Sequence, residues 1–307
     1  MYYIVYGALY LLSLLPMPIL YLLSDFFFVL IYHVFGYRRN VVESNLRIAF
    51  PEKSDREIKS ISKKFYGNFV DNFIETLKYI SASNEFLRKR FSGDAEVLNT
   101  LYEKGKRCQV HMGHNFNWEL ANLSISFFSP YVFLGVYMPV KNKVIDRLLR
   151  GLRSKNGTVL LPATNMKETM LQYRDQQYLL GLIADQVPGN VSKAYWLNFF
   201  NKPTPFVQGP ERGARSGNVP VVFANIEKRK RGYYHINLEL ASEEPANLPV
   251  GELTRRYRDY LEVVIRRNPD MWLWSHRRWK REWKEEYRDR WIDSNEPNIA
   301  NAPALKY

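Results

Sequence analysis

The sequence predicts an α/β fold in which helices flank a mostly parallel central sheet, with an apolar membrane-anchoring helix at the N-terminus. Two observations lead to this prediction. From residue 107 onward, short apolar runs typical of buried strands alternate with segments whose apolar residues recur at helical spacing. Before them, residues 2–35 are almost wholly apolar or aromatic, and Asp25 is their only formal charge.

Length and composition predict one large domain. The 307 residues are 46% apolar and include no low-complexity tract, so we expect an anchor over residues 1–36, a main domain over 37–291 and a polar tail over 292–307. Cys108 is the only cysteine, which excludes an internal disulfide and a zinc-thiolate cluster. The net charge of +13 favours an acidic partner, whether nucleic acid, anionic lipid or an acidic carrier protein.

The N-terminal apolar run is longer than the ~20 helical residues that cross a bilayer core. It lacks the basic start and the small-residue cleavage site of a signal peptide. Pro16 and Pro18 divide it into two helical pieces, so it forms either one kinked span or a shallow hairpin. Arg38 and Arg39 follow at once, and the positive-inside rule then keeps the main domain in the cytoplasm.

The first helix after the anchor is predicted over residues 54–80. Its apolar residues recur every three or four positions, and Ser54 with Glu57 forms the sequence pattern of a capping box. The aromatic residues of this stripe, from Phe65 to Phe73, are expected in the core. Further helices are expected over residues 95–104, 118–128, 143–153 and 167–174, and strands over 107–111, 131–140, 158–162, 178–185, 219–226 and 233–240.

His114 is the candidate catalytic residue. It lies in the turn between a predicted strand and a predicted helix, where catalytic residues of parallel sheets gather, and Glu119 follows it by five positions. A histidine acts as a general base when a carboxylate holds its other ring nitrogen. The turn contains no serine or cysteine, so an acceptor hydroxyl or amine would attack directly in a ternary complex. The alternative is a histidine that only caps the helix. His111 is expected to point into the sheet.

The C-terminal segment is predicted to contact lipid headgroups. Tryptophans alternate there with basic residues, a mixture typical of the membrane interface. The tryptophans are Trp272, Trp274, Trp279, Trp283 and Trp291. The same mixture suits single-stranded nucleic acid, but no nucleic-acid motif accompanies it, and we expect no nucleic-acid partner.

Several short motifs follow one another in order along the chain. They are the apolar N-terminus, His114-x4-Glu119, Arg153-Ser154-x-x-Gly157, Ala184-Asp185-Gln186 before Pro188-Gly189, residues 199–205, Gln208-Gly209-Pro210 before Ala214-Arg215, Pro220-Val221-Val222, and the segment from Pro269 to Lys280. Each is weak alone. Together they resemble, over nearly the whole chain, the late acyltransferases of lipid A biosynthesis, of lauroyl and myristoyl transferase type.

The resemblance implies a glycerolipid-acyltransferase-like fold at the cytoplasmic face of the inner membrane. It implies transfer of a fatty acyl group from acyl carrier protein to a hydroxyl of a lipid A precursor, with no metal and no cofactor beyond the acyl carrier co-substrate. His114 resembles the general base, Glu119 its orienting acid, and Arg153 and Asp185 the charged pair that completes the site. Arg147 and Arg150 lie within seven residues of Arg153 and are rival substrate-binding residues.

Asn117 is a further substrate-binding candidate, because it and Asn115 depart from the apolar or glycine-rich residues expected between the histidine and the acid. Two other functions stay open. One is an acyltransferase for another lipid, such as an aminolipid or a glycolipid. The other is a noncatalytic membrane adaptor, which would not need the intact His114 and Glu119.

Overall fold

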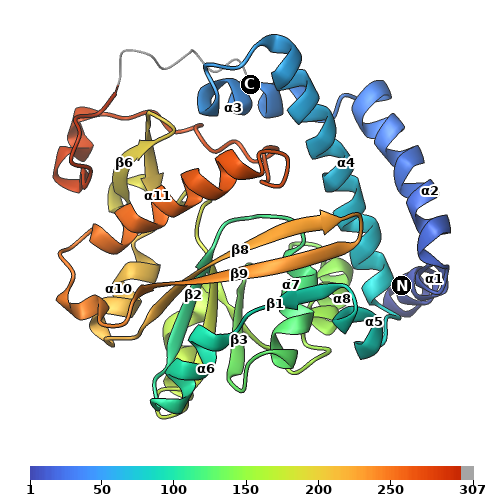
Figure 1. The fold of residues 1–307 in the computed structure, drawn as a ribbon, viewed down its shortest axis with the longest axis horizontal. Coiled ribbons are helices and arrows are strands. Elements are labelled where there is room, and N and C mark those ends of the chain that lie inside the picture. The colour runs from blue at the N-terminus through green and yellow to red at the C-terminus, as the bar shows by residue number, and fades with distance from the viewer. Residues whose placement is uncertain (299–307) are drawn as a thin grey trace.

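The computed structural model describes residues 1–298, apart from the side chain of Lys167. It confirms an α/β fold with a mostly parallel sheet flanked by helices and preceded by apolar helices (Figure 1). The strands are β1 (Phe91–Gly93), β2 (Cys108–Met112), β3 (Val132–Tyr137), β4 (Val159–Pro162), β5 (Tyr178–Ile183), β6 (Tyr195–Phe199), β7 (Lys202–Phe206), β8 (Val221–Lys230) and β9 (Tyr233–Ser242). The α-helices are α1 (Tyr2–Ser13), α2 (Met17–Phe28), α3 (Arg39–Ala49), α4 (Asp55–Tyr79), α5 (Asn84–Arg88), α6 (Glu96–Glu103), α7 (Trp118–Ser124), α8 (Lys143–Arg153), α9 (Met166–Leu171), α10 (Gly209–Ser216) and α11 (Glu252–Arg267).

The central sheet has seven strands in the order β1-β9-β8-β2-β5-β3-β4. Strands β8, β2, β5, β3 and β4 run parallel, while β9 returns antiparallel to β8. Strand β2 lies between β5 and β8, so its carboxyl end is at the middle of the sheet. The six strands expected from the apolar runs are all present, with ends that differ by a few residues.

Several elements were not among the sequence predictions. The two-stranded sheet of β6 and β7 was missed, and its second strand carries Pro203 and Pro205. Proline removes a backbone donor and so weakens the sequence signal of a strand. Helix α11 was missed as well, although Leu253, Tyr257 and Leu261 recur at helical spacing and are buried.

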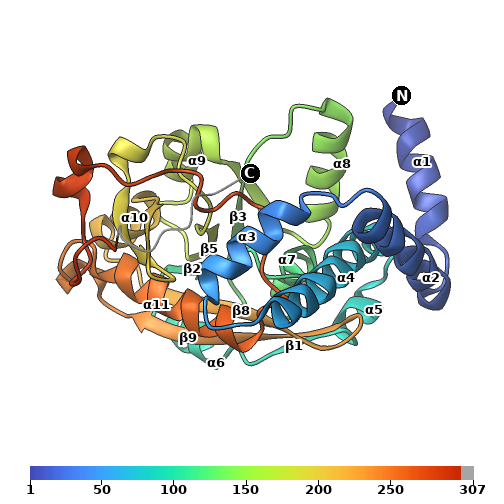
Figure 2. The ribbon, with the colours of Figure 1, turned by 90° about the horizontal axis from the view of Figure 1, so that it is seen from above.

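The N-terminal segment forms two helices, as Pro16 suggested. Helix α2 continues as a π-helix over Val29–Val34, and Met17–Val34 is the one described segment long and apolar enough to cross a membrane. Helix α2 packs beside α4 (Figure 1), and α1 projects from the body on the same side as α8 (Figure 2). The boundary predicted at residue 36 therefore separates segments that pack against each other.

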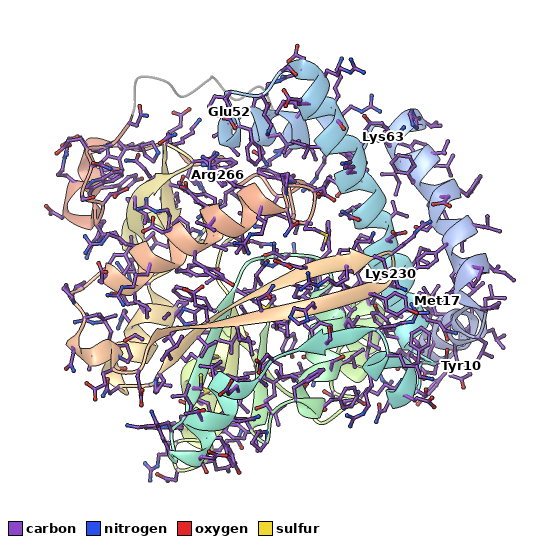
Figure 3. All side chains as sticks on the ribbon, viewed as in Figure 1. Tyr10, Met17, Glu52, Lys63, Lys230 and Arg266 are labelled. Carbon is purple, nitrogen blue, oxygen red and sulfur yellow. The ribbon has the colours of Figure 1, made fainter. Side chains whose placement is uncertain are left out.

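Polar groups join α2 to the rest of the fold. The Tyr21 hydroxyl donates to Glu75 (2.9 Å), and the Ser24 hydroxyl donates to Asp71 (2.7 Å). Arg231, at the turn of the β8–β9 hairpin, bridges Asp71 (2.7 Å) and Asp25 (2.6 Å). Figure 3 labels Lys230, the neighbour of Arg231, near the tip of this hairpin. Helix α2 is thus bound to the rest of the fold by polar contacts that range from buried to exposed.

The C-terminal segment differs from the prediction. Trp272, Trp274 and Trp279 are 2%, 0% and 0% exposed, and they pack in the main core rather than facing lipid headgroups. The physical reason is that the segment pairs with the turn at His114: the Leu273 amide donates to the His114 carbonyl (3.1 Å). An extended backbone paired in this way turns alternate side chains inward. The interfacial prediction for these three tryptophans is wrong.

The predicted polar tail begins later than residue 292. Asp293 accepts hydrogen bonds from Arg258 (2.9 Å) and from the Asn198 amide (2.9 Å), and the Asn298 amide donates to Asn198 (3.3 Å). The chain therefore stays attached to the domain through residue 298. The rest of the predicted tail, residues 299–307, lies outside the described residues.

Candidate active site

His114 and Asp185 meet at the carboxyl end of the central strands. The parallel register of β2 and β5 sets Met112 opposite Ile183, and each candidate residue follows its strand by two positions. The turns after neighbouring parallel strands leave the sheet at the same edge. The His114 Nδ1 atom lies 2.5 Å from Asp185 Oδ1.

The buried Asp185 carboxylate accepts hydrogen bonds from three N–H groups. It is 1% exposed and accepts from the His114 amide (2.8 Å), from His114 Nδ1 and from Trp272 Nε1 (2.6 Å). Burial raises the pKa of this carboxyl, but the charge and hydrogen bonds of His114, together with Trp272, outweigh burial and lower the pKa to about 2. Asp185 is thus an anion throughout the physiological range.

Gly113 allows the turn that carries His114 to lie close to the Asp185 carboxylate. A Cβ atom at this position would lie 2.9 Å from the Leu261 side chain and 3.1 Å from Asp185 Oδ2. A larger residue would force the turn away from the carboxylate. The residue before the histidine therefore needs to be small.

The contacts of His114 define its reactive nitrogen. Because an ionised carboxylate only accepts, the proton resides on Nδ1, and Nε2 carries the basic lone pair. Gln186 Nε2 lies 3.1 Å from His114 Nε2 and donates to it. The histidine side chain is 20% exposed, and an acceptor at this nitrogen would take the place of Gln186. A histidine general base requires an arrangement of this kind.

Glu119 does not bind His114, contrary to the prediction. Its carboxylate binds Arg153 through Nε (3.0 Å) and Nη2 (2.5 Å), and it accepts from Trp118 Nε1 (3.1 Å). Glu119 lies in the first turn of α7, where its side chain meets the last turn of α8. The predicted pair of Arg153 with Asp185 is likewise replaced by two pairs, His114 with Asp185 and Arg153 with Glu119.

The Arg153–Glu119 pair is largely buried. The side chains are 23% and 6% exposed. Burial lowers the pKa of Arg153, but the hydrogen bonds and charge of Glu119 more than reverse this and leave the pKa raised. Glu119 occupies the Nε and Nη2 edge of the Arg153 guanidinium. Nη1 has no hydrogen bond within residues 1–298, so the other edge of the guanidinium is available to a ligand.

Asn117 is buried and has a structural role at the start of α7, and substrate binding by it stays a prediction. It is 0% exposed. Its side-chain Oδ1 accepts from the Leu120 backbone amide (3.1 Å), which makes Asn117 the N-cap of α7. Its side-chain Nδ2 donates to Glu75 (2.8 Å) and Tyr79 (2.9 Å).

Arg147 and Arg150 lie on the outer face of α8, apart from Arg153. The Arg147 guanidinium sits 4.1 Å from the centre of the Tyr2 ring on α1. Both arginines line a surface hollow of about 820 Å³ between the start of α1 and α8, the α1–α8 hollow. Substrate binding by these two residues stays a prediction.

His111 points into the sheet as expected. It is 2% exposed, its Nε2 lies 2.9 Å from the Gln109 side chain, and burial lowers its pKa to about 3. Gln186 and Trp272 contact the catalytic pair but were not among the predicted site residues. Both belong to motifs recognised in the sequence: Gln186 follows Asp185 directly, and Trp272 lies in the segment from Pro269 to Lys280. Membership of these motifs could have identified them as site residues.

No three His, Cys, Asp or Glu side chains gather to hold a metal ion among residues 1–298. The prediction that no metal or organic cofactor takes part is not tested by this observation.

Comparisons with known proteins place the chain in a family. No curated protein matches the sequence. Among solved structures, the 1-acyl-sn-glycerophosphate (LPA) acyltransferase PlsC from Thermotoga maritima matches over 88% of this chain and 97% of its own, with 16% identity and a TM-score of 0.37. The family of bacterial lipid A biosynthesis acyltransferases matches residues 1–281. The chain therefore belongs to the bacterial lipid A biosynthesis acyltransferase family.

Proposed function

We propose that this enzyme moves a fatty acyl chain from acyl carrier protein to a hydroxyl of a lipid A precursor, with His114 as the general base. The observation that carries the proposal is the contact of His114 Nδ1 with the buried Asp185, which leaves Nε2 as the basic nitrogen, where the acceptor hydroxyl would displace the Gln186 amide. Family membership supplies the class of reaction.

The proposed reaction proceeds by direct transfer. The acceptor hydroxyl gives its proton to His114 Nε2 while its oxygen attacks the thioester carbonyl of the acyl carrier protein. The tetrahedral intermediate collapses, the carbon–sulfur bond breaks, and the departing sulfur takes the proton back from Nε2. Asp185 stabilises the imidazolium that exists between the two proton transfers. No group on the enzyme becomes acylated.

Glu119 replaces Asp185 as the partner of Arg153 in this scheme. Glu119 fixes the guanidinium through Nε and Nη2, so the remaining edge presents its donors in a defined direction. We assign that edge to an anionic group, either a phosphate of the acceptor or the oxyanion of the intermediate. Glu119 is thus a positioning residue for Arg153, and the orienting acid of His114 is Asp185.

The basic surface suits an acidic carrier protein and a phosphorylated lipid. The net charge of +13 attracts both over a distance. Arg147 and Arg150 in the α1–α8 hollow are the side chains that we assign to these anionic groups. The hollow opens beside the membrane-facing helix α1, where a lipid acceptor would arrive.

We also propose that the N-terminal helices lie in one leaflet at the cytoplasmic face of the inner membrane. Lipid surrounds a helix that spans a bilayer on all sides, whereas α2 is bound along one side by charged and polar groups of α4 and the β8–β9 hairpin. Its other side is apolar and exposed, as is that of α1. The exposed residues include Ile4, Leu11, Ile19, Leu22, Phe26 and Phe27. This favours the shallow hairpin over the kinked span.

Mass spectra of lipid A and of total lipids test the proposal. Cells that lack the gene receive the native chain, His114→Ala, or His235→Ala as a control on strand β9. We expect the deletion to remove one acyl mass from lipid A, and we expect only the native chain and the control to restore it. Restoration by His114→Ala would show that the chain works without the proposed base, as an adaptor does. Loss of an acyl group from another lipid instead would move the acceptor to that lipid.

A further inference from the structure

Gln186 covers the nitrogen of His114 that the proposed reaction needs. Its side-chain Nε2 lies 3.1 Å from His114 Nε2, and this is the one hydrogen bond of the Gln186 side chain among residues 1–298. Because the Nδ1 proton of His114 is directed at Asp185 (2.5 Å), the lone pair on Nε2 accepts this N–H. The lone pair that would take the proton of the acceptor hydroxyl is therefore already occupied.

The backbone on both sides of Gln186 is held in place. The Asp185 carboxylate, one residue before it, accepts from the Trp272 indole (2.6 Å). The Val187 amide, one residue after it, donates to His276 Nε2 (3.2 Å). Both partners belong to the C-terminal segment. The Gln186 side chain therefore starts from a fixed point beside the histidine.

Other side chains cover the rest of the His114 ring. Trp118 packs edge-on against the imidazole, with 5.7 Å between the ring centres, and only 20% of the histidine side chain is exposed. Three side chains thus contact the imidazole: Trp118 packs on its ring, Asp185 binds Nδ1 and Gln186 binds Nε2. The hydrogen bond to Asp185 involves a charge, whereas that to Gln186 is between neutral groups and is the weaker of the two. The contact at the reactive nitrogen is therefore the one that a substrate displaces most easily.

Water and a lipid hydroxyl differ in what they gain by replacing Gln186. A water molecule only exchanges one hydrogen bond to Nε2 for another, and the internal hydrogen bond is favoured over that exchange by roughly three- to tenfold. A lipid acceptor also binds through parts that do not react, and this binding energy can drive the amide away from the histidine. Gln186 therefore keeps water from the base more effectively than it keeps a lipid acceptor from it.

We infer that Gln186 is a specificity-determining residue that protects the donor thioester from hydrolysis until a lipid acceptor displaces it from His114. The inference rests on the proposed function, which supplies the thioester and the general base. In the reaction that Gln186 suppresses, water gives a proton to His114 Nε2 while its oxygen attacks the thioester carbonyl. The carbon–sulfur bond then breaks and the sulfur takes the proton from Nε2. The products are a free fatty acid and the free thiol of the carrier protein.

Hydrolysis of the thioester without an acceptor tests the inference. The native chain, Gln186→Ala and Gln186→Met each receive an acyl carrier protein thioester, and free fatty acid and acylated lipid are measured with and without a lipid A precursor. Gln172→Ala, at an exposed position directly after α9, is the matched control. We expect Gln186→Ala to hydrolyse the thioester roughly three- to tenfold faster than the native chain, and to raise the ratio of hydrolysis to transfer by a similar factor. Gln186→Met, which has no N–H donor, should also exceed the native rate of hydrolysis, and the control should keep it.

The His114→Ala background shows whether the added hydrolysis uses the base. Gln186→Ala should add no hydrolysis in this background, and added hydrolysis there would overturn the inference. Hydrolysis at the native rate in Gln186→Ala would overturn it as well, as would an equal fall in hydrolysis and transfer. If Gln186→Ala does not fold, Gln186→Met decides: faster hydrolysis supports the inference, and the native rate contradicts it.

Failure of the proposed function gives a different pattern. The native chain would then transfer no acyl group to a lipid A precursor. If Gln186→Ala still hydrolyses the thioester through His114, the acceptor is wrong and the role of Gln186 stands. If no variant transfers or hydrolyses, the proposed function and the inference both fail.

Discussion

At the scale of single residues, the proposed mechanism depends on which carboxylate binds His114. The carboxylate at His114 comes from Asp185, 71 residues further along the chain, and not from Glu119. Spacing in the sequence favoured Glu119 because one helical turn brings residues close. The rotation of α7 turns that side chain toward Arg153, while the β2–β5 register brings the distant carboxylate into contact.

Asp185→Asn should therefore lower kcat by about 10³-fold, because an amide group facing Nδ1 can donate to it and so place the histidine proton on Nε2. KM should change little. Steady-state acyl transfer at neutral pH measures both. His235→Asn serves as the control. A value of kcat within a few-fold of the native enzyme would show that another group orients His114.

His111 makes stability depend on pH. Burial lowers its pKa to about 3 in the folded state, while in the unfolded chain it ionises near 6.5. Below about pH 6.5 the unfolded state binds a proton that the folded state does not, so stability falls as the pH decreases toward 3. Between about pH 6.5 and about pH 4.5 this loss is on the order of 2 to 3 kcal/mol.

His111→Gln should therefore show a shallower loss of unfolding free energy on acidification than the native chain, although it is less stable at neutral pH. Urea unfolding at several pH values measures the slope, and His235→Gln should keep the native slope. An unchanged slope in His111→Gln would place the acid sensitivity elsewhere, with His276 as the next candidate because its pKa is lowered to about 4.

At the scale of elements, hydrogen bonds at the start of α7 connect the candidate site to the N-terminal helix α2. Asn117 caps α7 and donates to Glu75, which also accepts from Tyr21 on α2 and from Tyr234 on β9 (2.8 Å). Burial raises the pKa of Glu75, and the nearby Asp71 adds to this. One buried carboxyl group thus joins four elements, and the helix that carries Glu119 is one of them.

Asn117→Ala should lower the unfolding free energy by about 2 to 4 kcal/mol, because it removes an N-cap and leaves buried hydrogen-bond partners unsatisfied. We expect kcat to fall, because α7 positions Glu119, and KM for the lipid acceptor to stay within about twofold. Chemical denaturation and steady-state kinetics provide the two quantities, with Asn84→Ala on α5 as a surface control. A large rise in KM with native stability would support the substrate-binding prediction for Asn117.

The predictability of the elements followed the strength of their local signals. Strand β2 and helix α8 were predicted within one residue because each combines a clear apolar pattern with a turn or cap at its end. Helix α7 was predicted to begin at Trp118, as it does. Strand β6 contacts α11 and the C-terminal segment, and β7 pairs with β6; no local pattern encodes these contacts.

The sequence predicted which residues form the candidate site but not which of them contact each other. Motif order identified His114, Glu119, Arg153 and Asp185, but the pairs they form depend on sheet register and helix rotation. The tryptophans of the closing segment show the same limit. Their alternation with basic residues is typical of a membrane interface, yet tertiary pairing with the His114 turn buries three of them. Composition cannot distinguish these two environments.

At the scale of the whole molecule, the enzyme has an apolar side formed by α1 and α2. Leu22 is 70% exposed on this side, although a polar network fixes the other side of α2 to the domain. Leu240 on β9 is 42% exposed and lies away from the N-terminal helices. The two leucines therefore form a matched pair for a test of membrane attachment.

Leu22→Glu should weaken binding to liposomes of anionic phospholipid by roughly tenfold, because it removes one buried leucine and adds a negative charge at the interface. Leu240→Glu adds the same charge to the domain and should bind like the native chain. Flotation with liposomes measures the affinity, and alkaline extraction of cell membranes distinguishes the two modes of attachment. A hairpin that lies in one leaflet should be released by alkali, whereas a spanning helix is retained. Retention of the native chain, together with equal flotation of both variants, would show that α2 crosses the bilayer and that its contacts with α4 and the β8–β9 hairpin are broken in the membrane.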